Sequence, residues 1–288
     1  MTSRILPQFQ LFMPQSIPEV LDCLGLFKEK AAVMAGGTDL LVRMKSGLNP
    51  QAVVSLAKVP GLDTITYDTS QGLTLGAMVT VNQLLAFPEL ADLYPALFAA
   101  AYENGTEQTR NLATITGNIL NASPAADCSC AVLALGGHLI LEGPEGRRQV
   151  DIDDFWLDYK KTARQPDELA VALVIPPPGK SRSAFKGLTR TRKDLAKINA
   201  ACAIALDGKS CAKVRIAMGA VAPTHIRLKS CEELLTGKEM TPALLNEAAA
   251  LATEEVRPID DVRSTAEYRR RVAGTLVKEV LTLALESS

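Results

Sequence analysis

Apolar and polar positions in the first fifth of the chain predict a small α/β unit. Residues 18–27 carry apolar side chains at helical spacing, with Ser16 placed as the N-cap and a proline near the first turn. The apolar run at 31–34 is typical of a buried strand, and a second strand is expected at 52–56. Residues 5–56 therefore form one strand–helix unit in our interpretation.

A different pattern begins near residue 60. Residues 62–67 and 73–78 alternate apolar and polar positions around the polar segment 68–72, which predicts a hairpin with a longer loop. Patterns with helical spacing follow at 81–87 and 90–102. This stretch is therefore expected to combine antiparallel strands with helices.

Regular patterns stop between residues 104 and 130, where glycine, threonine, asparagine, serine and proline dominate. The apolar core resumes at 131–135 and 138–141. A strand predicted at 168–175 ends in the three prolines 176–178. Three prolines continue neither a strand nor a helix, so we expect a domain boundary there.

The last third follows its own pattern. Residues 198–206 and 214–221 flank Asp207-Gly208, a strong hairpin signal. Helical patterns follow at 228–235, 242–255 and 264–285. A chain of 288 residues exceeds one typical core. The expected domains are 1–57, 58–178 and 179–288.

Composition narrows the class of protein. An apolar content of 47%, a charged content of 22% and a net charge of −1 are ordinary for a soluble globular protein. This balance gives no reason to expect nucleic acid or a membrane surface as partner. Residues 1–9 lack the features of a secretory signal, and no apolar run is long enough to span a bilayer. A basic stretch at 180–215 fits a solvated face, although it could also face phosphate or a partner subunit.

The six cysteines are scattered, and only Cys128 and Cys130 stand close together. At that spacing the pair is a poor disulfide, and no second close pair completes a metal site. We expect six reduced thiols in a cytoplasmic protein, with Cys202 as buried filler.

The glycine pair Gly36-Gly37 is the first candidate site. It joins the predicted strand 31–34 to a segment with helical spacing, and Thr38-Asp39 follows it. Paired glycines at such a junction turn tightly and direct N–H groups to one point, which suits a phosphate or pyrophosphate. An ordinary strand–helix turn is the alternative. Neither a Walker loop nor the Gly-x-Gly-x-x-Gly fingerprint is present.

The irregular segment 104–127 is the second candidate. It is rich in hydroxyls and side-chain amides and poor in groups that transfer protons, so it suits a planar or phosphorylated ligand. A long surface crossover is the alternative. His138 is expected in the core or at a strand end, and His225 in a loop; neither fits a catalytic constellation. A cofactor that carries the chemistry itself, such as a flavin, fits these features.

Several motifs together resemble one family. Residues 35–41 read Ala-Gly-Gly-Thr-Asp-Leu-Leu, and residues 110–127 read Arg-Asn-x-Ala-Thr-Ile-Thr-Gly-Asn followed by Pro-Ala-Ala-Asp. Further matches are Tyr159-Lys-Lys-Thr, Pro166-Asp-Glu-Leu, Ala184-Phe-Lys and the segment from 259 to 272. The whole chain resembles the flavin subunit of the molybdenum hydroxylases, the medium chain of the xanthine dehydrogenase and carbon monoxide dehydrogenase family.

The resemblance implies an α+β fold. Two α/β subdomains of the PCMH type would clasp FAD, and a C-terminal domain would hold a three-stranded antiparallel sheet with helices. The implied cofactor-binding residues are Val33, Met34, Ala35, Gly36, Gly37, Thr38, Asp39 and Leu40 at the pyrophosphate; Thr114, Ile115, Thr116, Gly117 and Asn118 as a second set; Asn121 and Asp127 at the flavin or its hydroxyls; Leu169 and Ala170 beside the isoalloxazine; and Lys186 and Asn104. Catalytic residues and metal ligands are not implied for this chain.

Two positions depart from the family pattern. Thr116 replaces the first glycine of a usual pair, and FAD fits there if Thr116 has a negative φ. Asn104 stands where some relatives place an aromatic residue that stacks on the cofactor. One stacking contact is therefore expected to be missing.

The resemblance also implies a function. Substrate would be oxidised at a molybdopterin centre on a large subunit, and electrons would pass through two [2Fe-2S] clusters on a small subunit to this FAD. An acceptor such as NAD or a quinone would then receive them, in a dimer of heterotrimers. A self-sufficient flavin oxidase of the same fold and a non-catalytic nucleotide-binding assembly factor are the alternatives.

Overall fold

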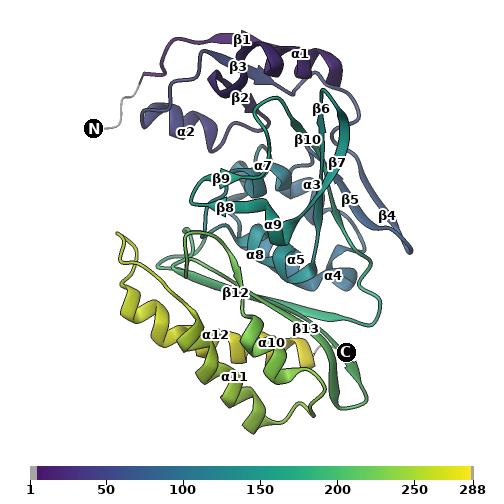
Figure 1. The fold of residues 1–288 in the computed structure, drawn as a ribbon, viewed down its shortest axis with the longest axis vertical. Coiled ribbons are helices and arrows are strands. Elements are labelled where there is room, and N and C mark those ends of the chain that lie inside the picture. Colours follow the sequence, from purple (N-terminus) through teal and green to yellow (C-terminus); the bar gives the residue numbers. More distant parts are fainter. Residues whose placement is uncertain (1–4, 287–288) are drawn as a thin grey trace.

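Three larger β-sheets of the described residues follow one another along the long axis of the molecule, with helices between and around them (Figure 1). The computed structural model describes residues 5–286. Residues 1–4, on which part of the signal-peptide prediction rests, lie outside the described residues. The proposed domain division at 57/58 and 178/179 falls between the sheets.

The first sheet is parallel, with strand order β1-β3-β2. Its elements are β1 (Gln10–Phe12), α1 (Ile17–Phe27), the 3₁₀ helix η1 (Lys28–Lys30), β2 (Ala31–Met34), α2 (Leu40–Lys45) and β3 (Ala52–Ser55). The predicted cap is confirmed, because the Ser16 hydroxyl accepts from the Glu19 N–H at 3.4 Å. The prediction that 31–34 is buried is wrong. All four residues of β2 are half-buried, since this strand forms the sheet edge.

The second sheet is antiparallel, with strand order β4-β5-β10-β6-β7. Its strands are β4 (Ile65–Asp68), β5 (Gly72–Gly76), β6 (His138–Gly143), β7 (Gly146–Asp151) and β10 (Leu169–Ile175). The hairpin predicted around 68–72 is confirmed. The Asp68 carboxylate accepts from the backbone N–H groups of Ser70 and Gln71 and fixes its loop.

Seven helices accompany this sheet among the described residues: α3 (Val81–Leu85), α4 (Leu90–Leu93), α5 (Pro95–Glu103), α6 (Glu107–Arg110), α7 (Ile115–Leu120), α8 (Asp127–Leu135) and α9 (Ile152–Phe155). The helix predicted at 90–102 is broken, because Pro95 begins a new helix and leaves Tyr94 outside helical geometry. A small hairpin of β8 (Trp156–Asp158) and β9 (Lys161–Thr162) follows α9.

The prediction that 104–130 lacks regular structure is wrong. α6 and α7 lie within this segment, and α8 begins at its end. α6 and α7 span four and six residues, too few to show a helical period. α8 is buried on nearly every side and therefore lacks an amphipathic pattern.

The third sheet is antiparallel, with strand order β11-β12-β13-β14. Its strands are β11 (Arg182–Leu188), β12 (Ile198–Asp207), β13 (Ser210–Gly219) and β14 (Ile226–Arg227). The helices of this unit are α10 (Lys229–Leu235), α11 (Pro242–Glu255) and α12 (Ala266–Glu286). The hairpin at Asp207-Gly208 and the three helices are confirmed. The two-residue β14 makes the sheet four-stranded instead of three-stranded.

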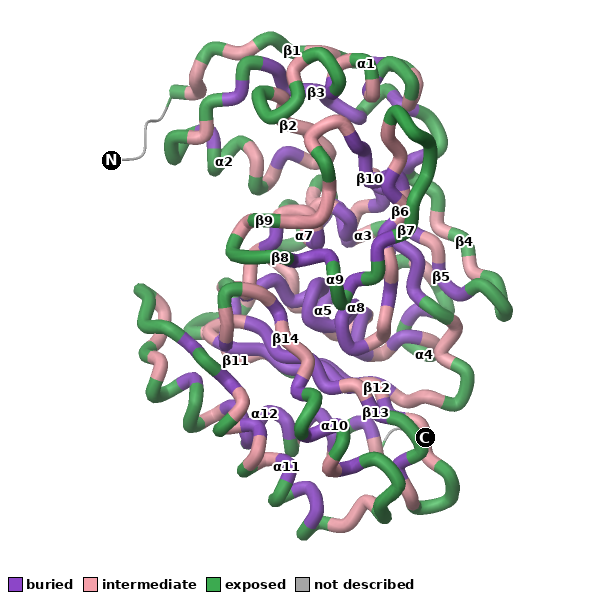
Figure 2. The backbone as a smooth tube through the Cα atoms, viewed as in Figure 1, coloured by how far each residue is buried: buried purple, intermediate pink, exposed green. Residues whose placement is uncertain are grey.

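Helices cover both faces of the third sheet (Figures 1 and 2). Alternate residues along β12 point to opposite sides. Ala201 joins the core around α5 and α8, whereas Ala200 and Cys202 join the core around α11 and α12. All six cysteines are free, and Cys202 is fully buried as predicted. The second and third units therefore share a continuous interface.

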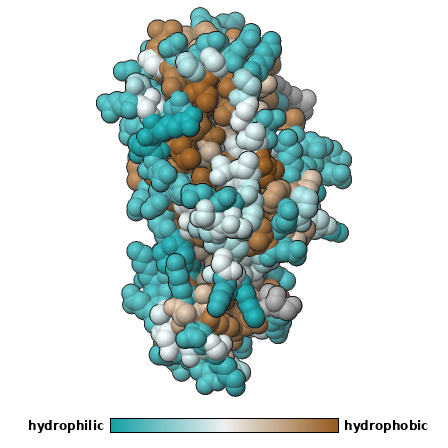
Figure 3. Space-filling model, turned by 90° about the vertical axis from the view of Figure 1, so that its right-hand side faces the viewer, coloured by the Kyte–Doolittle hydropathy of each residue, from teal (hydrophilic) through white to brown (hydrophobic). Residues whose placement is uncertain are grey.

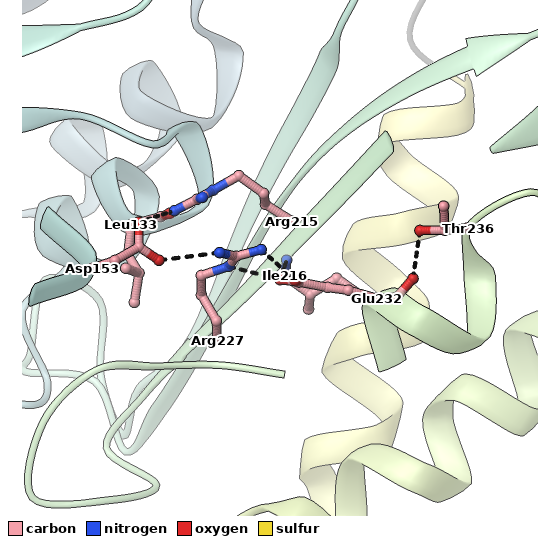
Figure 4. A network of polar contacts seen from close by, with 7 residues as sticks. All are labelled: Leu133, Asp153, Arg215, Ile216, Arg227, Glu232 and Thr236. Atoms are coloured by element: carbon pink, nitrogen blue, oxygen red, sulfur yellow. Dashed lines mark hydrogen bonds and ion pairs between the residues drawn. The ribbon is translucent and has the colours of Figure 1, made fainter. Parts of the chain in front are cut away.

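A polar network reinforces this interface (Figure 4). The Asp153 carboxylate, on α9, accepts from Arg215 at 2.6 Å and from Arg227 at 3.1 Å, and both arginines belong to the third sheet. Arg215 also donates to the Leu133 carbonyl, and Arg227 pairs with Glu232. Although partial burial opposes it, pairing with the two arginines lowers the pKa of Asp153 below its ordinary value.

The face in Figure 3 carries polar residues along both margins, with hydrophobic residues gathered between them in its upper, middle and lower parts. Among residues 5–286, no helix is long and apolar enough to cross a membrane.

Candidate functional site

A cleft of about 1180 Å³ is lined by residues from all three units. The first unit contributes β2, the glycine loop and the start of α2, and the second contributes α7, the start of α8 and the β8–β9 hairpin. The third contributes Ala220, Pro223 and the segment that carries Asp261 and Arg263. The two segments that the sequence singled out separately thus share one cavity.

Most of the predicted site residues lie in this cleft. Those that line it are Val33, Ala35, Gly36, Gly37, Thr38, Asp39, Leu40, Asn104, Thr114, Thr116, Gly117, Asn118, Asn121, Asp127, Leu169 and Ala170. Met34, Ile115 and Lys186 are not among its lining residues. Ile115 is fully buried, and Lys186 forms an ion pair with Glu279 of α12 at 3.2 Å.

The glycine loop presents free N–H groups to the cleft. Gly37 has φ +72°, which favours glycine, and Gly36 packs directly against the backbone of Leu112. Within the described residues, the N–H groups of Gly36, Gly37, Thr38 and Asp39 donate no hydrogen bond. Adjacent unpaired N–H groups form a site suited to an anion.

The second segment forms the facing wall through α7. The Thr114 hydroxyl caps this helix by accepting from the Gly117 N–H at 3.1 Å, and the Ile115 N–H donates to Val79. Thr116 lies inside the helix and is not among the residues with positive φ, so the condition expected for FAD is met. Its buried hydroxyl has no partner in the described part of the chain.

Asp127 brings a buried carboxyl to the cleft. It begins α8 and accepts a hydrogen bond of 2.6 Å from the Asn199 side chain on β12. Burial raises the pKa of Asp127 to about 7, against the opposing effect of Asn199. The site therefore includes a group that titrates near neutral pH.

The two histidines lie where the sequence predicted. His138 begins β6, and His225 lies in the loop before β14. His225 is buried and bonds the Ala126 carbonyl through Nε2 at 2.9 Å, and burial lowers its pKa to about 4. Over residues 5–286, no group of three or more His, Cys, Asp or Glu residues is arranged to hold a metal ion.

Sequence reasoning assigned no role to several residues that line the cleft, including Arg43, Lys160, Arg164 and Arg263. Lys160 belongs to the Tyr159-Lys-Lys-Thr motif and Arg263 to the matched segment 259–272, so the resemblance contained a signal for both. Arg43 carried no comparable signal. Only the fold brings it to the cleft.

The cleft fits FAD on two observations. Four consecutive N–H groups of the glycine loop remain available for a pyrophosphate. The cleft volume of about 1180 Å³ also leaves room for a dinucleotide.

Comparisons with known proteins agree with this geometry. Residues 7–178 match the family model of the FAD binding domain in molybdopterin dehydrogenase, and residues 183–284 match the CO dehydrogenase flavoprotein C-terminal domain.

The similarity extends over nearly the whole chain. The carbon monoxide dehydrogenase medium chain of Hydrogenophaga pseudoflava is 32% identical over 280 residues, covering 96% of this chain and 97% of that protein. A putative xanthine dehydrogenase FAD-binding subunit of Escherichia coli (strain K12) is 29% identical over 273 residues, covering 93% and 94%. The solved carbon monoxide dehydrogenase from H. pseudoflava that lacks the Mo-pyranopterin moiety matches with a TM-score of 0.94 and 32% identity, over 98% of each chain.

The fold and the two family matches define a flavoprotein. The chain belongs to the molybdenum hydroxylase family as an FAD-binding medium subunit, and its cofactor is FAD. It is a subunit of an oxidoreductase.

Proposed function

We propose that this chain transfers electrons between the iron–sulfur clusters of a partner subunit and an external acceptor. The observation that carries the proposal is the single cleft in which the glycine loop 36–39 faces the Thr114–Asn118 segment. FAD bound there supplies the redox chemistry, because flavins accept and release electrons. The protein's own residues bind the cofactor and orient it.

The proposed contacts divide by chemistry. The N–H groups of Gly36 to Asp39 bind the pyrophosphate. At the start of α7 the Thr116 N–H is a further donor, because the Ile115 and Gly117 N–H groups already donate to Val79 and Thr114. Asn121 and Asp127 form hydrogen bonds with hydroxyls of the cofactor. The backbone of Leu169 and Ala170 lies beside the isoalloxazine. Met34, whose sulfur lies beside Gly37, and Ile115, in the core, support the two walls by packing.

Lys186 is the predicted contact with the least structural support. Its ammonium pairs with Glu279 on α12, outside the residues that line the cleft. A cofactor contact for Lys186 stays a prediction.

The proposed partners are a large molybdopterin-binding subunit and a small subunit with two [2Fe-2S] clusters, arranged as a dimer of heterotrimers in the cytoplasm. The acceptor is NAD or a quinone. The names of the medium-chain relatives and the similarity over nearly the full chain support this assembly.

Affinity purification of the tagged full-length chain from its native cell tests the proposal. We expect two co-purifying subunits, with molybdopterin and iron–sulfur clusters, and release of FAD from this chain on denaturation. A yellow chain that purifies alone and is bleached by a substrate would instead identify a self-sufficient oxidase. A colourless chain that FAD does not reconstitute would identify an assembly factor.

A further inference from the structure

Lys160 occupies an unusual position at the turn of the β8–β9 hairpin. Its φ of +58° lies in the left-handed region that non-glycine residues rarely adopt. Its ammonium donates to the backbone carbonyl of Asn121 at 2.8 Å and to the side-chain oxygen of Asn121 at 3.0 Å. The hairpin is thereby attached to the C-terminal end of α7, and the third N–H of the ammonium remains available.

Lys160 is a half-buried cation without an anion. It lines the cleft, and no carboxylate of the described residues forms an ion pair with it. Several other charged residues of the cleft are already engaged. Glu168 pairs with Arg148, Arg269 pairs with Asp261, and Arg164 donates to three backbone carbonyls.

Arg43 is a second unpaired cation in the same cleft. It lies on α2 of the first unit, whereas Lys160 belongs to the second, and Arg43 too forms no ion pair within residues 5–286. Burial first and the charge of Arg43 second lower the pKa of Lys160, and Asp39 partly offsets them. Two cations that repel each other at a cofactor cleft are stabilised when an anion binds between the units.

We propose that Lys160 and Arg43 supply the positive charge that balances the pyrophosphate of FAD. Lys160 has a second effect, because it occupies both oxygens of Asn121 and leaves the amide nitrogen of that side chain available to the cofactor. The inference rests on the proposed placement of FAD in this cleft. It adds positive charge to the neutral N–H groups of the glycine loop.

FAD titration of the cofactor-free full-length chain tests the assignment, with flavin fluorescence as readout at low and high salt. Lys160→Met keeps the apolar stem and the backbone strain but removes the charge. Because Lys160→Met loses one charge-assisted contact, we expect it to bind FAD about tenfold more weakly than the wild type. Its affinity should also fall less on adding salt than that of the wild type. Arg43 is exposed, so we expect Arg43→Met to weaken FAD binding by only about threefold. Lys161→Met, the exposed neighbour, is the matched control and should bind as the wild type does.

Lys160→Arg retains the charge, so it should keep most of the affinity if Lys160→Met folds poorly. Wild-type affinity and an unchanged salt dependence in Lys160→Met would overturn the assignment. The same holds if Lys160→Met only lowers the melting temperature of the cofactor-free protein, because Lys160 would then simply anchor the hairpin. A wild-type chain that binds no FAD would contradict the proposed function itself.

Discussion

Gly36 lies so close to Leu112 that a Cβ on Gly36 would stand 1.7 Å from the Leu112 carbonyl oxygen. The contact joins the glycine loop of the first unit to the segment that precedes α7. The two walls of the cleft therefore touch through their backbones, and the absence of a side chain at Gly36 permits the contact.

Gly36→Ala should separate the two loops. The obstructing atom belongs to the backbone and cannot move cheaply, so we expect a loss of about 2–3 kcal/mol in the free energy of unfolding. Denaturant unfolding measures this loss, and FAD content should fall with it. Gly25→Ala is the control, because Gly25 is exposed in α1 with open space around it and should gain about 0.5–1 kcal/mol. Equal stabilities for the two variants would contradict the contact.

Asp153→Asn should weaken the interface between the second and third units. The substitution removes the charge that Arg215 and Arg227 share, and we expect a loss of about 1–3 kcal/mol in the free energy of unfolding. Asp154→Asn, at the exposed neighbouring residue, should change stability by less than about 0.5 kcal/mol. Because the pKa of Asp153 is lowered, its contribution is present at neutral pH and is lost on acidification below about pH 4. An Asp153→Asn variant as stable as Asp154→Asn would disprove this role.

Asp127 and His225 should give opposite pH dependences of stability. The folded pKa of His225 is about 4, below its ordinary 6.5. Its contribution to the free energy of unfolding is therefore lost as pH falls from 6.5 to 4. The folded pKa of Asp127 is about 7, above its ordinary 3.8. Its contribution to the free energy of unfolding is therefore lost as pH rises from 3.8 to 7. The two effects offset each other between pH 4 and 6.5.

Single substitutions separate these effects in the cofactor-free chain. Asp127→Asn leaves His225, and the free energy of unfolding should rise by roughly 3 kcal/mol from pH 4 to 6.5. His225→Gln leaves Asp127, and the free energy should fall by roughly the same amount. Urea unfolding across this range measures both slopes, with the wild type as the flatter reference. Slopes of the same sign in both variants would refute the assignment.

Local signals in the sequence predicted much of the fold. The Ser16 cap, the hairpin loop closed by Asp68 and the turn at Asp207-Gly208 each depend on neighbouring residues, and each was found. The helices between 104 and 130 were missed. α6 and α7 are too short to show a period, and α8 is too buried to show an amphipathic face.

In the candidate site, too, local features were predictable from the sequence and long-range contacts were not. The glycine pair was visible because a strand, a turn and a helix follow one another in sequence. Asn199 reaches Asp127 across 72 positions and Lys160 reaches Asn121 across 39, so packing of distant elements creates both contacts. The fold also decides that Lys186 pairs with Glu279.

FAD titration of Gly37→Val against Gly47→Val tests the placement of the cofactor most directly. Both glycines have positive φ, +72° and +112°, so valine strains the backbone at either site, but only Gly37 lines the cleft. We predict that the wild type and Gly47→Val bind one FAD per chain, whereas Gly37→Val loses at least about tenfold in affinity while remaining folded. Wild-type FAD binding by Gly37→Val would contradict the placement of the pyrophosphate at the glycine loop.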